Sequence, residues 1–140
     1  MIWQRTLFMI KPGMIERGLV GSIISTLEDM GVVIERMEMR QISHEVAQRF
    51  YESHFDKPFF HALVDYITSG RVVVMVLAGE DIIARMRNVM GDTDPAKAAP
   101  GTIRARYGES LRRNAVHGSD SAHTAEFEIA VIFPDMASVG

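Results

Sequence analysis

The chain has 140 residues, of which 47% are hydrophobic and 24% charged, and its formal net charge is -3. This length suits one domain, predicted to span residues 1–140, and the composition is that of a globular protein with a buried core, which excludes a disordered chain. The absence of cysteine excludes disulfides, thiolate metal sites and a cysteine nucleophile, and the slightly negative charge argues against binding of nucleic acid.

Strand and helix patterns alternate from the start of the chain. Residues 6–10 form a short apolar run that ends at Lys11-Pro12-Gly13, which predicts a buried strand followed by a turn. Residues 19–30 place apolar side chains on one helical face, and Gly31 stands where a helix ends. Residues 32–40 alternate as a strand, with Met37 and Met39 on one side and Arg36, Glu38 and Arg40 on the other.

The middle of the chain continues this alternation. Ser43 is a predicted cap for a helix that buries Val46, Ala47 and Phe50, and a second helical pattern follows Pro58. Residues 72–78 are continuously apolar and rich in valine, which indicates a central strand buried on both faces. Asp81 is a predicted cap for the next helix, which is expected to end at Gly91.

Regular patterns stop at residues 92–113, where prolines and glycines interrupt any periodicity. A loop of this length in a compact domain usually has a function. A short strand within residues 114–120 is expected next. Residues 124–133 fit a helix or a strand by pattern alone.

The order of these elements predicts the fold class. Strands and helices alternate in a way that suggests an α+β protein with a ferredoxin-like sandwich. We expect a four-stranded antiparallel sheet with helices packed on one face of it.

Among the five histidines, His117 has the surroundings of a functional residue. It lies between polar side chains and next to Gly118, which allows a ligand to approach closely. Neutral imidazole is a nucleophile near neutral pH when a partner holds one ring nitrogen and the other is free. An ordinary histidine in a polar turn at a strand end fits the same pattern, so the residues alone leave both interpretations open.

Cationic side chains gather near this histidine in the sequence. Arginine suits phosphate because its planar group can make two parallel hydrogen bonds, and Thr93 could add a hydroxyl donor. For Arg112 and Arg113 a solvated basic loop is the preferred interpretation. The cations in or beside the loop, on the helix before it and at the end of the first strand are Arg104, Arg106, Arg112, Arg113, Arg85, Arg87 and Lys11.

Other chemistries lack their motifs. The chain has no G-x-x-x-x-G-K-[ST] segment for a P-loop, no G-x-G-x-x-G for a dinucleotide and no G-x-S-x-G for a serine hydrolase. It has no H-E-x-x-H or paired histidines at ligand spacing, which argues against a zinc site.

Residues 114–120 read NAVHGSD, and this segment resembles the N-x-x-H-G-S-D signature of nucleoside diphosphate kinases. The resemblance covers essentially the whole chain in matching order and spacing, and it resolves the last segment as a helix. Further segments that match the family are Lys11-Pro12, Lys57-Pro58-Phe59-Phe60, Arg87, Gly91-Asp92-Thr93-Asp94-Pro95 and Gly101-Thr102-Ile103-Arg104.

The resemblance implies a ping-pong phosphotransferase. His117 would take the γ-phosphate of a nucleoside triphosphate as a phosphohistidine and pass it to a nucleoside diphosphate. Glu128 matches the carboxylate that holds the other ring nitrogen, and Ser119 matches the residue that supports this carboxylate. Tyr51 matches a tyrosine packed beside the histidine.

The resemblance also implies the nucleotide contacts. Phosphate-binding positions are matched by Arg87, Thr93 and Arg104, and the positions that contact the ribose and reach toward the phosphates by Lys11 and Asn114. Phe59 and Leu111 match the two sides of a slot that stacks any base, which implies broad base specificity. Mg²⁺ would be the cofactor, held mostly by the nucleotide phosphates rather than by the protein.

The chain departs from the family at Gly13-Met14, at Arg71 and at Arg106, and Arg106 puts the charge of the loop around Arg104 in doubt. Short members of the family form tetramers or hexamers, so a homo-oligomer is expected. Without a secretion signal or an apolar run long enough for a membrane span, the expected location is cytoplasmic. Two other classes stay open: a ferredoxin-like module that senses nucleotides or binds RNA, and a histidine phosphatase.

Overall fold

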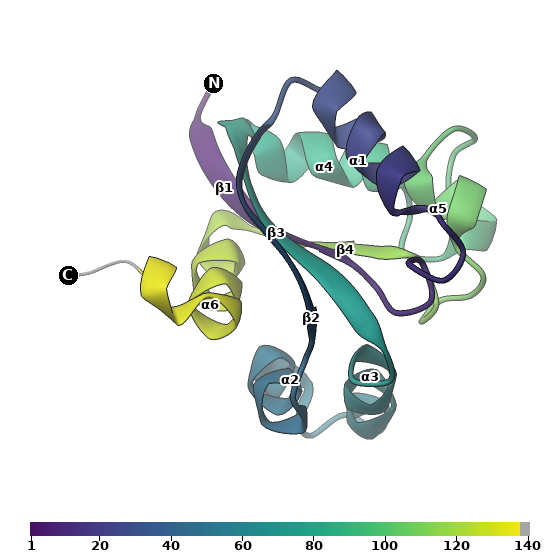
Figure 1. Cartoon of the computed structure of the whole chain (residues 1–140), viewed down its shortest axis with the longest axis vertical. Coiled ribbons are helices and arrows are strands. Elements are labelled where there is room, and N and C mark those ends of the chain that lie inside the picture. Colours follow the sequence, from purple (N-terminus) through teal and green to yellow (C-terminus); the bar gives the residue numbers. More distant parts are fainter. Residues whose placement is uncertain (138–140) are drawn as a thin grey trace.

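A computed structural model of the chain describes residues 1–137. Four strands form one antiparallel sheet in the order β2-β3-β1-β4 (Figure 1). The strands are β1 (Trp3–Ile10), β2 (Val33–Gln41), β3 (Arg71–Glu80) and β4 (Val116–Gly118). The helices are α1 (Val20–Asp29), α2 (His44–Phe50), α3 (Phe60–Ile67), α4 (Ile82–Met90), α5 (Ile103–Tyr107) and α6 (Ala122–Ile132), with single 3₁₀ turns η1 (Glu52–His54), η2 (Pro95–Lys97) and η3 (Pro134–Met136).

This arrangement confirms the predicted ferredoxin-like α+β fold with its four-stranded antiparallel sheet. The strands predicted from apolar runs are present; β1 begins three residues before its predicted limit, and β3 begins one residue before and ends two residues after its own. The last segment is a helix, α6, as the family resemblance implies.

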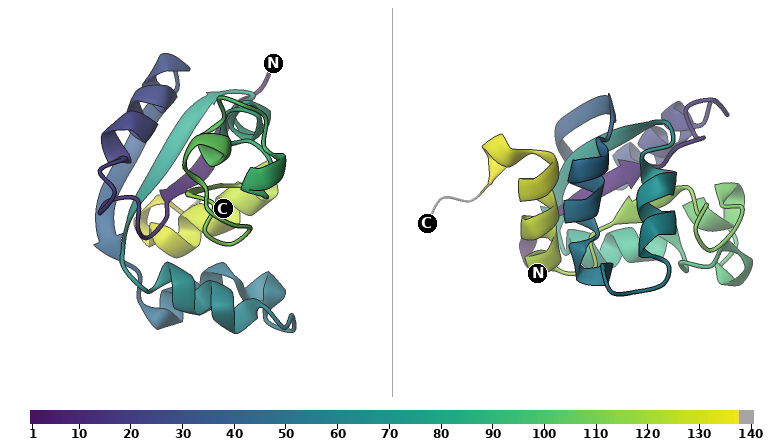
Figure 2. Two further views of the ribbon diagram at one scale, coloured as in Figure 1. Left: turned by 90° about the vertical axis from the view of Figure 1, so that its right-hand side faces the viewer. Right: turned by 90° about the horizontal axis from the view of Figure 1, so that it is seen from below.

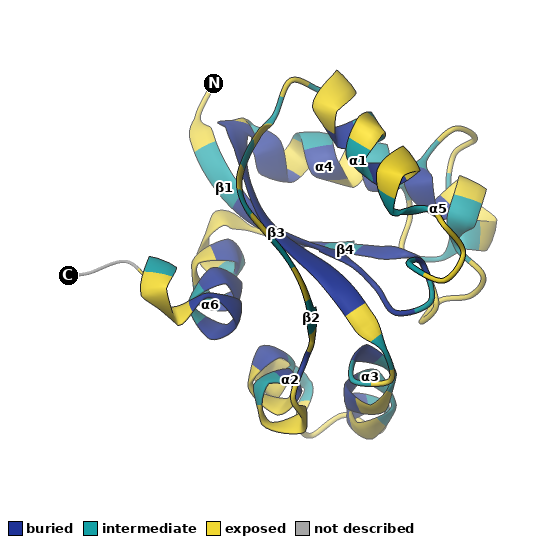
Figure 3. Ribbon diagram, viewed as in Figure 1, coloured by how far each residue is buried: buried dark blue, intermediate teal, exposed yellow. Residues whose placement is uncertain are grey.

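Helices cover both faces of the sheet, so the expectation of helices on one face is wrong (Figure 2). On β1, Phe8 and Ile10 pack with α1 and α4, whereas Leu7 and Met9 pack with α2, α3 and α6. The cause is the composition of β1 and β3: successive side chains point to opposite faces, and here both sets are apolar. Residues 72–79 of β3 are all buried, as Figure 3 shows. A sheet with two such central strands needs a layer on each side.

The predicted helix caps are only partly confirmed. The hydroxyl of Ser43 accepts a hydrogen bond from the Val46 N–H at 3.2 Å and caps α2. Asp81 precedes α4 but its side chain does not cap it; Oδ1 accepts instead from the Ile2 N–H at 3.1 Å. The Asp81 N–H donates to the Ile2 carbonyl at 2.7 Å, so this residue connects the end of β3 to the start of the chain.

The edge strand β2 alternates as predicted, but Met37 and Met39 lie on its exposed side. Met37 and Met39 are 53% and 47% exposed. Arg36 and Arg40 lie over the buried ring of Phe133, with their guanidinium carbons 4.6 and 5.0 Å from its centroid. Their aliphatic stems and cationic heads cover the aromatic ring, which explains why charged side chains occupy the half-buried positions.

Residues 92–113 are more regular than predicted. They contain η2 and the five-residue helix α5, in which the Thr102 hydroxyl accepts from the Ala105 N–H at 3.3 Å. Gly91 ends α4 with a φ of 86°, as predicted, and packs against Thr102. The middle of the long loop therefore packs against the end of α4. Across residues 1–137, no helix combines the length and apolar character needed to cross a bilayer.

Replacing Gly91 with alanine should destabilise the fold. A Cβ atom there would lie 2.7 Å from Thr102 Cβ and closer still to its hydroxyl, and the φ of 86° is itself unfavourable for alanine. We expect a loss of about 1–3 kcal/mol in the free energy of unfolding, measured by urea denaturation. The matched control is Gly101→Ala, because Gly101 has a φ of 89° with open space around it. Equal losses in the two variants would contradict a steric role for Thr102.

Candidate active site

His117 lies in the middle of β4, where it pairs with Met9 of β1. The imidazole therefore projects on the same face as Met9, toward α2 and α6, and its ring meets the Phe50 ring edge-on at 5.2 Å. The turn before β4 contains Ala115 with a φ of 76°, and its carbonyl accepts from the Lys11 N–H at 2.9 Å. A strained alanine of this kind is kept only where its surroundings hold it, which makes the start of β4 a well-defined position.

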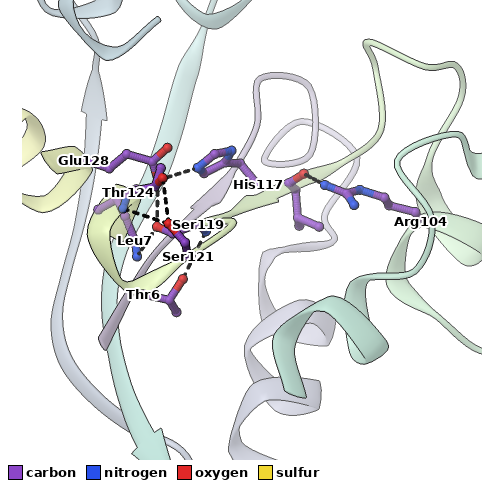
Figure 4. Close-up of polar contacts among 9 residues, drawn as sticks. Thr6, Leu7, Arg104, His117, Ser119, Ser121, Thr124 and Glu128 are labelled. Atoms are coloured by element: carbon purple, nitrogen blue, oxygen red, sulfur yellow. Dashed lines mark hydrogen bonds and ion pairs between the residues drawn. The ribbon is translucent and has the colours of Figure 1, made fainter. Parts of the chain in front are cut away.

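A chain of short hydrogen bonds holds the imidazole (Figure 4). His117 Nε2 is 2.8 Å from Glu128 Oε1, and the Ser119 hydroxyl donates to the same oxygen at 2.7 Å. Because a carboxylate only accepts hydrogen bonds, Nε2 carries the proton in this pair. The neutral ring then keeps its free electron pair on Nδ1, which is the arrangement of an oriented nucleophile.

Glu128 reaches this position because α6 begins directly after β4. The Ser121 hydroxyl accepts from the Thr124 N–H at 3.0 Å and caps the helix, so Glu128 lies two turns into α6 and faces the sheet. The Glu128 residue is only 6% exposed. A buried carboxylate needs compensating donors, and Ser119 and His117 supply them.

The backbone of β1 contributes to the same chain of bonds. The Leu7 N–H donates to the Ser119 hydroxyl at 3.0 Å, and the Ser119 N–H donates to the Thr6 hydroxyl at 3.1 Å. Thr6 was not among the site residues predicted from the sequence. In the sequence, Thr6 stands out only as a polar residue at the start of an apolar run.

A cavity of about 760 Å³ opens beside His117. It brings together most of the residues that the family resemblance assigns to the nucleotide. Ser119 lies behind Glu128 and does not line the cavity, and Phe59 does not line it either. The predicted site residues along its walls are Lys11, Tyr51, Arg87, Thr93, Arg104, Leu111, Asn114, His117 and Glu128.

Arg104 is the buried cation of this cavity. Its guanidinium donates to the Gly91 carbonyl and to the Val116 carbonyl, both at 3.0 Å, which joins α4, α5 and β4. Burial lowers the pKa of Arg104 below its ordinary value, while the carboxylates of Asp120 and Asp92 act in the opposite direction. Within residues 1–137, Arg104 Nε is a buried donor without a hydrogen-bond partner. A buried positive group with an unused donor is suited to an anionic acceptor.

Lys11 is the second buried cation. Its Nζ donates to Asn114 Oδ1 at 2.7 Å. The Asn114 amide in turn donates to the carbonyls of Thr93 and Leu111, at 3.0 and 3.1 Å, so Asn114 connects Lys11 to the long loop. Burial, and secondly the charge of Arg104, lower the pKa of Lys11 from 10.5 to about 7.

The remaining predicted residues are less enclosed. Tyr51 is half-buried beside Phe50, and burial together with the Glu128 carboxylate raises the pKa of Tyr51, so its hydroxyl stays protonated. Phe59 stacks at a tilt on the ring of His54 at 5.5 Å, and His54 itself lines the cavity. Leu111 is 60% exposed at the cavity rim.

The departures from the family pattern lie outside the cavity. Arg106 is exposed and stacks on the ring of Tyr107 at 4.7 Å, pointing its charge to an aromatic face rather than to Arg104. Gly13 has a φ of 96°, and Met14 is buried in the core. Arg71 is exposed at the start of β3.

Two arginines expected to be solvated behave differently from one another. Arg113 is exposed and stacks on Tyr66 at 5.0 Å, whereas Arg112 is exposed and lines the cavity. Among the described residues, no group of three or more His, Cys, Asp or Glu side chains could hold a metal ion.

The family model described as nucleoside diphosphate kinase matches residues 4–137. The chain belongs to this family. A nucleoside diphosphate kinase of Desulforamulus reducens is 52% identical over 130 residues, which cover 93% of this chain and 87% of that protein.

Solved structures of nucleoside diphosphate kinases have the same fold. The enzyme of Aquifex aeolicus superposes with a TM-score of 0.92 at 40% identity, covering 99% of this chain and 100% of the other. The enzyme of Halobacterium salinarum, solved in complex with CDP, superposes with a TM-score of 0.90 at 44% identity, covering 98% and 91% of the two chains. Family membership favours a nucleoside diphosphate kinase over the RNA-binding module and the phosphatase considered from the sequence.

The buried lysine of this cavity should make stability depend on pH. The pKa of Lys11 is about 7 in the folded chain and 10.5 as its ordinary value. Between these two pH values the unfolded chain binds more protons, so the folded state gains stability as pH rises. The contribution of one group is at most about 1.4 kcal/mol per pH unit.

The test compares urea unfolding of the wild type and of Lys11→Met between about pH 7 and about pH 9. Stability of the wild type should rise more steeply with pH than that of the variant. Lys97→Met, at an exposed lysine, is the control and should retain the wild-type slope. Identical slopes in the wild type and Lys11→Met would refute the assignment to Lys11.

Proposed function

We propose that His117 carries the transferred phosphoryl group. As a member of its family the chain is a transferase that moves phosphoryl groups between nucleotides. The observation that supports His117 as the carrier is the 2.8 Å bond between Nε2 and Glu128. It commits one ring nitrogen to a carboxylate and leaves the electron pair of Nδ1 for attack, in a residue that lines the cavity.

The proposed reaction has two half-steps. Nδ1 attacks the γ-phosphorus of a nucleoside triphosphate, so an N–P bond forms and the bond to the bridging oxygen breaks. The nucleoside diphosphate leaves with that oxygen. A β-phosphate oxygen of a second nucleoside diphosphate then attacks the phosphohistidine, the N–P bond breaks, and neutral His117 is regenerated. Glu128 stabilises the positive charge that the ring acquires while Nδ1 carries the phosphoryl group.

Cations that line the same cavity support phosphate binding. Arg104 supplies a buried positive charge, Arg87 an exposed one, and Thr93 a hydroxyl group. Neutralising the oxygens of the transferring group is the main task of a phosphoryl-transfer site. Lys11 and Asn114 are joined by a hydrogen bond and line the same cavity, and we propose that they contact the ribose hydroxyls and reach toward the phosphates.

A nucleotide kinase generally uses a divalent metal, and we propose Mg²⁺ here. The lack of a carboxylate cluster among the described residues fits an ion that the nucleotide phosphates hold. Bound in that way, Mg²⁺ would supply charge neutralisation on the phosphate oxygens.

We also propose broad base specificity. Leu111 at the cavity rim would supply an aliphatic edge, and Phe59, whose ring contacts that of His54, would supply an aromatic face. Stacking on such groups does not distinguish bases by their hydrogen-bonding edges. The CDP complex of the Halobacterium salinarum relative is compatible with a slot that takes a pyrimidine. Because one phosphoanhydride is exchanged for an equivalent one, nucleotide concentrations would set the direction of transfer.

Incubation with γ-labelled ATP and Mg²⁺, followed by unlabelled GDP, tests this mechanism. Label should appear on the protein in an acid-labile, base-stable form and then move to GTP. His117→Ala should lose both steps, because the variant lacks the imidazole nitrogen that would form the N–P bond. His61→Ala, which removes an exposed histidine on α3, is the control and should behave as the wild type. Label transfer in His117→Ala would rule out His117 as the carrier.

We further propose that the chain forms a homo-oligomer, a tetramer or a hexamer, through the edge strand β2. Val33, Met37 and Met39 of β2 are each about half exposed, at 47%, 53% and 47%. An uncovered edge strand with apolar side chains favours association with another chain. Met37 and Met39 lie on the same face of the sheet as α1, which covers the central strands of that face.

The double variant Met37→Glu/Met39→Glu should dissociate this oligomer. Burying two added carboxylates in an interface is unfavourable, so the molar mass from light scattering should fall toward that of one chain. Phe55→Glu is the control, because Phe55 is 74% exposed on the segment after η1 and away from β2. An unchanged mass in the double variant would argue against an interface at β2.

Three expectations from the sequence stay predictions: one domain over residues 1–140, a cytoplasmic location, and no binding of nucleic acid. The nucleotide pools that such a kinase would use are consistent with a cytoplasmic location. The formal net charge of -3 is consistent with the third.

A further inference from the structure

The backbone pairing of β4 with β1 ends one residue before Ser119. The last paired residues are Phe8 and Gly118. Beyond them, side chains take over the hydrogen bonding between the two segments (Figure 4). The Ser119 N–H donates to the Thr6 hydroxyl at 3.1 Å, and the Leu7 N–H donates to the Ser119 hydroxyl at 3.0 Å. Two neighbouring residues of β1 therefore hold Ser119 by its main chain and by its side chain.

These two hydrogen bonds fix the hydroxyl of Ser119 in one orientation. Its oxygen accepts from Leu7, so its single proton is directed to Glu128 Oε1 at 2.7 Å. The same carboxylate oxygen holds His117 Nε2 at 2.8 Å. Thr6 and Ser119 are 0% and 1% exposed, so water does not compete for these bonds.

We propose that Thr6 is a positioning residue for the phosphorylation of His117. Its hydroxyl holds the backbone of Ser119, Ser119 orients Glu128, and Glu128 orients the imidazole. The proposal rests on the phosphohistidine mechanism proposed above. Thr6 touches neither the nucleotide cavity nor His117, so it acts only through Ser119.

The geometry separates this role from that of an ordinary core residue. A threonine that only filled space could be replaced by valine, which has the same shape and the same preference for strands. In Thr6→Val the buried Ser119 N–H would lose its acceptor, and the main chain that carries the Ser119 hydroxyl would be free to shift. A small shift is amplified in the reaction, because a nucleophile misplaced by about 1 Å can react about 100-fold more slowly.

The test measures the rate of phosphohistidine formation from γ-labelled ATP in single turnovers. Thr6→Val should form phosphohistidine roughly 10- to 100-fold more slowly than the wild type, with ADP affinity changed by less than about twofold. Thr6→Ser keeps the hydroxyl acceptor and should restore the rate. A rate in Thr6→Val equal to that of the wild type, or a Thr6→Ser variant as slow as Thr6→Val, would overturn the proposal.

A double-mutant cycle checks the route through Ser119. Ser119→Ala removes the hydroxyl that acts on Glu128, so adding Thr6→Val to it should cause little further loss of rate. Thermal unfolding of the same variants reports stability separately. Thr6→Val removes the acceptor of the residue 119 backbone N–H whether or not Ser119→Ala is also present, so its cost in stability should appear in both backgrounds. Fully additive losses of rate would show that Thr6 does not act through the Ser119 hydroxyl.

Two controls isolate the inference. Thr68→Val removes another threonine hydroxyl, one that donates to the Val64 carbonyl in α3 at 2.8 Å and lies outside the site, and it should leave the rate unchanged. The wild type itself tests the underlying mechanism. If it forms no phosphohistidine, the proposed function fails, whereas normal formation by both wild type and Thr6→Val refutes only the role of Thr6.

Discussion

Burial of β1 and β3 on both of their faces is the constraint on which the rest of the structure depends. Residues 7–10 of β1 and 72–78 of β3 are almost completely removed from water, and they lie side by side in the middle of the sheet. Because their side chains alternate between two apolar layers, helices must cover both surfaces. Polar groups that need water or a ligand are then confined to the ends and edges of the sheet, and β4, beside β1, is the edge where the proposed active site lies.

The proposed active site contains buried groups of both charges. Glu128 is buried beside His117 with its two donors, and Lys11 and Arg104 are buried in the lining of the same cavity. The contacts that hold these groups also serve the fold: Arg104 joins α4, α5 and β4, and Ser119 joins β1 to α6. Hydrogen bonds offset part of the free-energy cost of burying these charges and fix their positions.

Much of this structure could be predicted from the sequence, and the failures have physical causes. Long apolar runs and helical spacing identified the strands and most helices, because burial on a whole face leaves a periodic signal. Helix α5 has five residues, too few to show a period, and it was missed. Asp81 occupies a cap position but bonds to Ile2, a contact between residues 79 apart that no local pattern can reveal. The residues around His117 fit either a functional or an ordinary histidine, because the fold, and not the local sequence, brings its partner Glu128 to it. The family signature favours the functional interpretation. Thr6 was overlooked because the fold likewise brings it to Ser119.

The connection of Ser119 to β1 also has a consequence for how the molecule opens. Groups bonded to a central strand are released only when the whole domain unfolds, whereas loops with few buried contacts open separately and more often. We therefore expect the amides of residue 119 and of β1 beside it to exchange more slowly than those of Thr93 and Leu111 in the long loop. Amide hydrogen exchange would report this as two distinct protection levels on either side of one cavity. The proposed nucleophile is thus held more firmly than the loop residues that line the same cavity.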